Sequence, residues 1–190
     1  AVVRNLVDAH SDTVFSIDFS RDGKHLVSGA ADKFVKQFEV ESGKLVRSYE
    51  GHTHHVLGVS WKGDGSRIAS AGADNAIKIW NVETGEQHRT IQNYSKQVTS
   101  IHFIGATDNI VSSGGDKTVK MHRANDGGNY RNFAGMPDFV YAVACTRDEA
   151  LVVAGGEDGV LRVWNGTNAQ ELFKFEPPKA PGDTTQAKAN

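Results

Sequence analysis

The sequence predicts an all-β protein built from four-stranded antiparallel sheets. The first observation is a repeat of 42 residues that runs without an insertion, so that equivalent positions form columns. Two of these columns are Val14, Val56, Val98 and Val140, and Asp32, Asp74, Asp116 and Asp158. The second observation is a period of two within each repeat, as in residues 15–19, which is typical of strands. Because both faces of such a sheet are apolar, the sheets must stack on one another, and a radial stack is a β-propeller.

Each repeat is long enough for four short strands joined by tight turns. In the first repeat we expect strands over residues 14–20, 25–28, 34–38 and 44–49. Asp22-Gly23 and Ser42-Gly43 follow the first and third of these, and glycine there can adopt a positive φ. The same pattern continues along the chain and predicts four blades, over residues 10–51, 52–93, 94–135 and 136–177.

Short segments flank the four blades. Residues 4–7 fall one period before residues 46–49, so we expect residues 1–9 to hold an outer strand of a preceding or shared blade. Residues 178–190 have no large apolar side chain and are predicted to form a polar linker or disordered tail.

Four blades make a partial propeller if the complete ring has more. An open arc exposes an apolar sheet face at each end, and burial of each large side chain is worth about 1.5–3 kcal/mol. We therefore expect completion by missing blades of a longer parent chain, or by a second copy in a homodimer with eight blades. The chain begins at Ala1 and not at Met, which agrees with a piece of a longer protein.

Gly51-His52 and Trp80-Asn81 resemble the Gly-His and Trp-Asp signatures of WD40 repeats, a family whose repeat length of about 40–45 residues includes 42. The chain is also similar to bacterial WD-repeat proteins, some of which are fused to c-type haem domains. It contains no CxxCH motif, so we expect no cofactor. The resemblance implies a protein-interaction scaffold without catalytic activity.

The resemblance also implies a buried hydrogen-bond chain in each blade, in which an Asp and a His act through a Ser or Thr to hold a Trp indole. The second blade has the complete tetrad of His52, Ser70, Asp74 and Trp80. The other blades have partial tetrads, formed by His10, Ser28 and Asp32, by Ser112 and Asp116, and by Asp158 and Trp164. Asp is the constant member, since its carboxylate can accept backbone N–H groups of a tight loop.

These polar residues also allow a catalytic or a metal-binding interpretation. Ser, His and Asp together can activate a nucleophile, but here the set recurs at a fixed step, which favours a structural role, and we expect no enzyme. His54 and His55 could hold a transition metal on the loop face, although no Cys or carboxylate cluster completes a coordination shell. Cys145 falls in an apolar column and is expected to be buried and inert.

A basic column raises the question of nucleic-acid binding. Its regular spacing instead favours side-chain stems that cover the aromatic column, with charges that reach solvent or an acid. The column consists of Lys36, Lys78, Lys120 and Arg162.

Function in such folds is expected on loops held by a rigid scaffold. We call the end of the blades formed by the connections from fourth to next first strand, and from second to third strand, the loop face. The candidate partner-binding residues on it are Asp12, Lys33, His54, His55, Tyr94, Lys96, Lys117, Asp138 and Phe139. An aromatic side chain beside Lys and Asp is typical of a protein contact, although each of these residues could also be a solvated loop tip.

Composition sets the remaining limits. The formal net charge is −2, with 21 basic and 23 acidic residues, so no bulk field attracts nucleic acid or an anionic membrane. No apolar run reaches the length of about 18 residues that a membrane helix needs. We expect a protein or peptide partner, no nucleic acid and no membrane. The alternatives are a structural module of a larger multidomain protein, or a metal-binding or enzymatic site on the loop face. The compartment stays open, cytoplasmic by default and periplasmic if the chain is excised from a larger exported protein.

Overall fold

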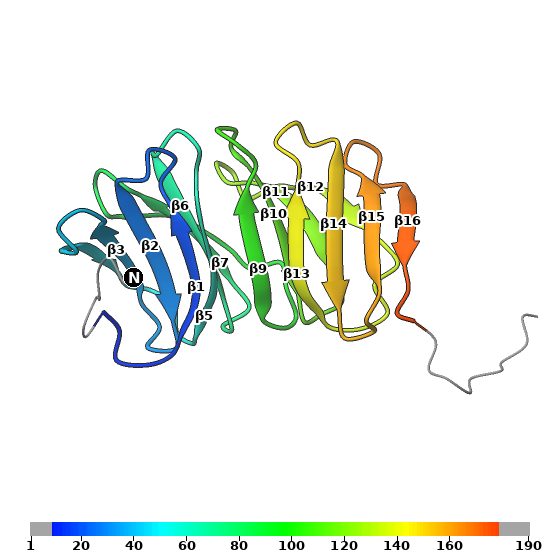
Figure 1. Ribbon diagram of the computed structural model, residues 1–190, viewed down its shortest axis with the longest axis horizontal. Coiled ribbons are helices and arrows are strands. Elements are labelled where there is room, and N and C mark those ends of the chain that lie inside the picture. The colour runs from blue at the N-terminus through cyan, green and yellow to red at the C-terminus, as the bar shows by residue number, and fades with distance from the viewer. Residues whose placement is uncertain (1–8, 179–190) are drawn as a thin grey trace, which may run out of the picture.

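The computed structural model describes residues 9–178. Within this range the regular secondary structure consists of β-strands alone. They form four antiparallel sheets of four strands each, and within each sheet the strands follow their order in the chain. Figure 1 shows the sheets in a row, as an arc that does not close within the described residues. The predicted all-β fold with four four-stranded blades is confirmed.

Each blade contains four consecutive strands. The first blade consists of β1 (Val14–Phe19), β2 (His25–Ala30), β3 (Val35–Glu39) and β4 (Leu45–Tyr49). The second consists of β5 (Val56–Trp61), β6 (Arg67–Gly72), β7 (Ile77–Asn81) and β8 (Gln87–Ile91). The third consists of β9 (Val98–Phe103), β10 (Asn109–Gly114), β11 (Val119–Arg123) and β12 (Asn129–Phe133). The fourth consists of β13 (Val140–Cys145), β14 (Leu151–Gly156), β15 (Leu161–Asn165) and β16 (Glu171–Phe175).

The strand bounds of the first blade differ from the predicted ones by at most two residues. The turn glycines behave as expected, since Gly23 has a φ of 70° and Gly43 a φ of 71°. The predicted outer strand within residues 1–9 lies outside the described residues, except for residue 9, and so does the predicted tail beyond residue 178.

One hydrophobic cluster fills each interface between consecutive blades. We call the face of a blade that points to the next blade its trailing face, and the face that points to the preceding blade its leading face. Between the first two blades, Val35 and Tyr49 on the trailing side share a cluster with Val59 and Trp61 on the leading side. The same columns form the other two clusters. The hydrophobic core is therefore distributed over the blade interfaces, as the repeat predicts.

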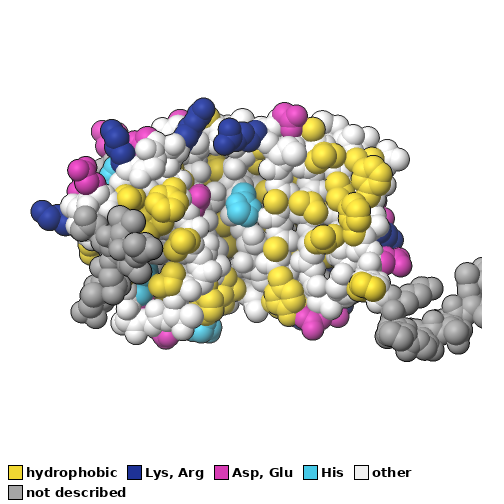
Figure 2. Space-filling model, viewed as in Figure 1, with side chains coloured by type: hydrophobic (Ala, Val, Ile, Leu, Met, Phe, Trp, Pro, Cys, Tyr) yellow, Lys and Arg dark blue, Asp and Glu magenta, His cyan; other side chains and the backbone are white. Residues whose placement is uncertain are grey.

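The two end faces of the arc are apolar and exposed. On the leading face of the first blade Ile17 is 60% exposed, whereas its equivalent Val59 is 3% exposed. On the trailing face of the fourth blade Phe175 is 60% exposed, against 3% for Phe133. Figure 2 shows hydrophobic side chains gathered at both ends of the arc. The columns that form the core elsewhere thus remain uncovered at both ends of the described chain.

A column of arginines ties each of the first three blades to the next. Arg47 donates to the carbonyl oxygens of Glu83 and Thr84, at 3.3 and 3.1 Å, in the β7–β8 turn. Arg89 donates to Asn125 O at 2.8 Å, and Arg131 donates to the carbonyl of Gly166. The fourth blade has no arginine in this column. Its equivalent residue is Phe173, which is 60% exposed.

The innermost strands carry a second set of polar ties. Ser16 Oγ accepts a 3.1 Å hydrogen bond from Val59 N, Asp18 Oδ2 accepts one of 2.7 Å from Trp61 N, and Ser60 Oγ accepts one of 2.9 Å from Phe103 N. In the fourth blade these columns contain Ala142 and Ala144, whose side chains accept no hydrogen bond. The trailing face of the fourth blade therefore lacks the polar side chains by which the other blades contact their successors.

Candidate interaction faces

The second blade contains the complete hydrogen-bond chain. His52 Nδ1 lies 2.9 Å from Asp74 Oδ2, and His52 Nε2 lies 2.8 Å from Ser70 Oγ. Trp80 Nε1 donates to the same Ser70 oxygen at 2.8 Å. A consistent set of protons has the Ser70 hydroxyl donating to Nε2 and the imidazole donating from Nδ1 to Asp74. The chain joins β6, β7 and the loop before β5.

Asp74 is held as a carboxylate by this arrangement. Burial alone would raise its pKa, but hydrogen bonds from His52 and from the backbone N–H groups of Thr53 and Ala76 hold the pKa below its ordinary value. Ser70 is fully buried and its oxygen is already bonded to His52 and Trp80, so it has no access to a substrate. The geometry therefore supports a structural role for this set.

The first blade repeats the arrangement without its last member. His10 Nδ1 lies 2.9 Å from Asp32 Oδ2, and His10 Nε2 lies 2.7 Å from Ser28 Oγ. The place of the indole is taken by Phe38, which is buried and donates no hydrogen bond. The network of the first blade thus lacks an indole donor, and Ser28 Oγ reaches only Lys36 O beyond the histidine, at 3.4 Å.

The third blade replaces the histidine with Tyr94. Its Oη lies 2.6 Å from Ser112 Oγ, while Asp116 accepts a 3.0 Å hydrogen bond from Ser95 N. Tyr94 is only 8% exposed, and burial raises its pKa. The prediction that Tyr94 contacts a partner is therefore wrong, because this residue occupies the buried column of His10 and His52.

His122 takes the indole position of the third blade and is fully buried. Neither of its ring nitrogens has a hydrogen-bond partner within residues 9–178. Burial, with a smaller contribution from Lys120, lowers the pKa of His122 to about 4, so the ring is neutral at pH 7. This residue is a local weakness in the core, since a buried unpaired nitrogen carries a desolvation cost.

The fourth blade lacks most of this hydrogen-bond chain, because Ala154 stands in the position of the serine. Asp158 Oδ2 instead forms a 2.6 Å ion pair with Arg162, and its Oδ1 accepts a hydrogen bond from Val160 N. Trp164 Nε1 donates to the carbonyl oxygen of Ala134 at 3.1 Å. Trp164 is thus anchored to the backbone and not to the Asp.

The basic column has internal partners throughout. Lys36 Nζ donates to Ala9 O at 2.7 Å, and Lys78 Nζ donates to Gln87 Oε1 at 2.9 Å. Lys120 Nζ lies 4.0 Å from Asp116 Oδ2 and 4.3 Å from the centre of the Tyr94 ring. With the Arg162 ion pair, these contacts show that the column does not present a free basic stripe to nucleic acid.

Cys145, expected to be buried, is only half-buried. Its Sγ lies 3.3 Å from Thr146 O, and burial, together with the nearby Glu149 and Asp148, raises the pKa of the thiol to about 11. The thiolate that reacts as a nucleophile is therefore scarce at neutral pH.

The other predicted partner-binding residues lie on the loop face. Those that are exposed are Asp12, Lys33, His54, Lys96, Lys117 and Asp138, whereas His55 and Phe139 are half-buried. Lys33 and Lys117 have φ angles of 75° and 69° at the tips of the turns that follow β2 and β10. Lys117 Nζ donates to Pro137 O at 2.8 Å. Phe139 packs over Gly115, where a Cβ would lie 2.4 Å from its ring.

His54 and His55 do not assemble a metal site in the described chain. Their ring centres are 4.4 Å apart, but the backbone N–H of His55 donates to His54 Nδ1 at 2.9 Å, and the His55 ring stacks on Phe15. Within residues 9–178 no group of three or more His, Cys, Asp or Glu side chains is placed to hold a metal ion.

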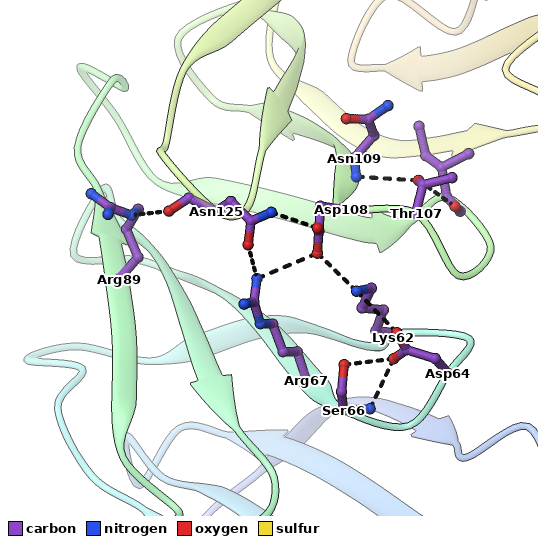
Figure 3. A network of polar contacts seen from close by, with 10 residues as sticks. Lys62, Asp64, Ser66, Arg67, Arg89, Thr107, Asp108, Asn109 and Asn125 are labelled. Carbon is purple, nitrogen blue, oxygen red and sulfur yellow. Dashed lines mark hydrogen bonds and ion pairs between the residues drawn. The ribbon is translucent and has the colours of Figure 1, made fainter.

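A polar network that the sequence did not indicate ties the second blade to the third, at the end opposite the loop face (Figure 3). Lys62 Nζ lies 2.8 Å from Asp108 Oδ1 and 3.0 Å from Asp64 Oδ2. Arg67 Nη1 lies 3.3 Å from the same Asp108 oxygen, and Asn125 Nδ2 donates to Asp108 Oδ2. These contacts hold the turns after β5, β9 and β11 together.

A groove of about 550 Å³ lies beside this network, along the ends of the innermost strands of all four blades. One of its columns contains Arg21, Gly63, Gly105 and Arg147. The backbone of the middle blades approaches closely there, since Gly63 N donates to Gly105 O at 2.7 Å. A Cβ on Gly63 would lie 2.7 Å from the same oxygen, so the position favours glycine. Sequence reasoning missed this groove, although the change from Arg to Gly and back within one column was a visible signal.

Comparison with known proteins agrees with this architecture. A family model described as "WD domain, G-beta repeat" matches residues 2–39, 43–81, 85–123 and 128–165, which is most of the chain. The chain belongs to the WD40 family. Comparison with curated proteins gives no match.

Two solved structures with the same fold are longer than this chain. The structure titled "Structure of U3-55K" is 25% identical with a TM-score of 0.83, and covers 90% of this chain and 54% of its own. "Crystal structure of RRP9 WD40 repeats" is also 25% identical, with a TM-score of 0.82, and covers 90% and 53%. The chain thus spans about half the length of these structures. Its described residues contain no helix that is long and apolar enough to cross a membrane.

Proposed function

We propose that this chain is a non-catalytic scaffold that presents its loop face to a protein or peptide partner. The supporting observation is a contrast between buried and exposed polar residues. Asp, His and Ser side chains are used inside the blades, as His52 and Ser70 show, and they fix the loops. At the loop tips the chemistry changes from blade to blade, with Lys33, His54, Lys96 and Asp138 exposed. A rigid support with variable tips suits recognition of another macromolecule.

The same geometry argues against an enzyme. The Ser, His and Asp sets are spread over the blades, and the hydroxyls of Ser70 and Ser112 are buried within hydrogen bonds. Acyl-transfer chemistry needs a nucleophile that a substrate can reach. A scaffold explains the presence of Asp in every blade, because each of these Asp side chains accepts a hydrogen bond from a backbone N–H of a loop-face connection.

We also propose that further blades complete the ring, in preference to a second copy of this chain. A second copy would place the trailing face of its fourth blade against the leading face of this first blade. Phe173 would then stand at the position from which Arg47 and Arg89 donate to the next blade at the other interfaces. Ala142 and Ala144 would offer no side-chain acceptor to the backbone N–H groups of the facing blade. At the other interfaces Ser16, Asp18 and Ser60 supply these acceptors. The solved structures that resemble this chain are about twice as long, which also fits further blades.

Charge reversal on the loop face tests the scaffold. The double variant Lys33→Glu/Lys96→Glu changes two exposed side chains, and the matched control Lys24→Glu/Lys44→Glu changes two exposed lysines at the opposite end. We expect the loop-face variant to capture less of the wild-type set of lysate proteins at an unchanged melting temperature, while the control captures the full set. Equal capture by all three proteins, or a loss in the control alone, would contradict the assignment of this face.

A further inference from the structure

We propose that the groove at the end opposite the loop face binds an acidic peptide segment of a partner protein. It is lined by residues of all four blades, among them Asp18, Lys62 and Arg147. The proposal goes beyond the loop-face scaffold, since the two sites lie at opposite ends of the innermost strands. The groove is a concave surface built by the repeat itself, at one end of the innermost strands.

Glycine in the middle blades shapes the floor of the groove. Gly63 and Gly105 occupy the column in which the outer blades have Arg21 and Arg147. The hydrogen bond between Gly63 N and Gly105 O brings the two backbones together, and neither residue has a side chain to fill the space above. The centre of the groove is therefore low. Arg21 of the first blade and Arg147 of the fourth blade bound it on either side.

The two arginines have no ion-pair partner among the described residues. Both are exposed, and neither Arg21 nor Arg147 has a side-chain hydrogen bond or an ion pair within residues 9–178. Lys62, which also lines the groove, is already paired with Asp64 and Asp108. A planar guanidinium binds a carboxylate through two parallel hydrogen bonds, so two unpaired guanidinium groups favour a ligand with carboxylates.

The acidic residues around the groove are committed to other partners. Asp18, the carboxylate that lines it, accepts hydrogen bonds from Trp61 N at 2.7 Å and from Phe19 N at 2.9 Å. Asp22 accepts from the Ser20 hydroxyl and Lys24 N, and Asp148 accepts from Ala150 N. Each of these carboxylates is held by hydrogen bonds within its own blade or to the next one, and within the described residues none of the three forms an ion pair with Arg21 or Arg147.

The aromatic residues of the groove favour a peptide over a nucleic acid. Single-stranded nucleic acid binds where successive bases stack on exposed aromatic rings. Trp61 and Phe103 reach the groove but are buried against the neighbouring blades, and only Phe19 is exposed. An acidic peptide needs only the two arginines and the hollow floor.

Fluorescence anisotropy with a labelled hexaglutamate peptide tests the proposal on the whole 190-residue chain. At about 50 mM salt, exposed charges are only partly screened. The variant Arg21→Gln/Arg147→Gln removes the two groove charges, and the control Lys33→Gln/Lys96→Gln removes two charges from the loop face. We expect the groove variant to weaken binding by about tenfold and the control to keep the wild-type affinity.

Three results would overturn the proposal. These are an absence of hexaglutamate binding to the wild-type chain, an equal loss in the groove variant and the control, and tighter binding of a labelled oligouridylate than of hexaglutamate. The first two would leave no specific acidic-peptide site, and the third would assign the groove to nucleic acid. The loop-face capture experiment uses other residues, so the two proposals can fail independently.

Discussion

The indole of Trp80 donates its N–H to the Ser70 hydroxyl at 2.8 Å, which links β7 to the Asp74–His52 pair. The equivalent indole in the fourth blade, Trp164, donates to a backbone carbonyl. Tryptophan in this column is therefore held in two ways. In the second blade a network of side chains holds it, and in the fourth blade a backbone carbonyl does. The second blade depends most on its serine, and this difference can be measured.

Removal of the Ser70 hydroxyl should destabilise the chain. In Ser70→Ala the Trp80 N–H and one His52 nitrogen lose their partner inside the core, and a buried unpaired group costs about 1–3 kcal/mol. The midpoint of urea unfolding measures the change. Ser66→Ala is the control, because its hydroxyl bonds only to the exposed Asp64. Equal midpoints for the two variants would show that the tetrad adds nothing to stability.

Replacement of His122 with Phe should stabilise the chain. The ring is fully buried and both nitrogens lack partners in the described residues, so Phe removes a desolvation cost of about 1–3 kcal/mol. Phe38 occupies the same column in the first blade and is buried there, which shows that the column accommodates this ring. Thermal unfolding at pH 7 gives the comparison. A lower melting temperature in His122→Phe would mean that the histidine has a partner not seen in this structure.

The same residue should make stability depend on pH. The pKa of His122 is lowered to about 4 in the fold from an ordinary value of 6.5, so the unfolded chain binds the proton more tightly. The contribution of neutral His122 to the free energy of unfolding is fully present above pH 6.5. It is lost as the pH falls towards 4, by up to about 1.4 kcal/mol per pH unit. Burial lowers the pKa of His88 and His102 as well, so we expect His122→Phe to reduce the slope and not abolish it. Urea unfolding at several pH values between 4 and 6.5 measures this dependence. The same slope of unfolding free energy against pH in the wild-type chain and in His122→Phe would contradict the prediction.

The ion pairs at Lys62 should be worth more than an exposed pair. Lys62 is buried between Asp64 and Asp108 on adjacent blades, and its removal takes one ion pair from each carboxylate. Lys62→Met should therefore lower the free energy of unfolding by about 2 kcal/mol. Arg123→Met, which breaks the exposed pair with Asp126, should cost less than about 1 kcal/mol. Equal costs would argue against a special role for the interface between these blades.

The fold could be predicted because the repeat records the same physical requirement four times. Val14 and its equivalents specify a buried strand position, and the Asp column specifies a tight loop, so the strands of each blade follow from the register. The exposed end faces also follow, since the columns of Ile17 and Phe175 have no further blade beside them within residues 9–178. Tyr94 was predicted on the loop face, but it shares the column of His10 and His52, and this column is buried in each of the first three blades.

Contacts between particular side chains on different blades could not be predicted. Lys62 and Asp108 stand in columns where the other blades have unrelated residues, so no periodicity marks the pair. The bond from Arg47 to the next turn depends on the distance between blades, which a sequence does not give. The groove required the same three-dimensional information, although the Arg21 and Gly63 column was visible in the repeat.

Sedimentation equilibrium of the 190-residue chain tests most directly the claim that the blades are stacked units whose end faces need neighbours. We predict an apparent mass that rises with concentration above the monomer mass of 20.6 kDa. It should return to that value in Ile17→Lys/Phe175→Lys, in which both end faces become charged. A discrete dimer would instead mean that a second copy closes the ring. A compact wild-type monomer at every concentration would contradict the claim itself.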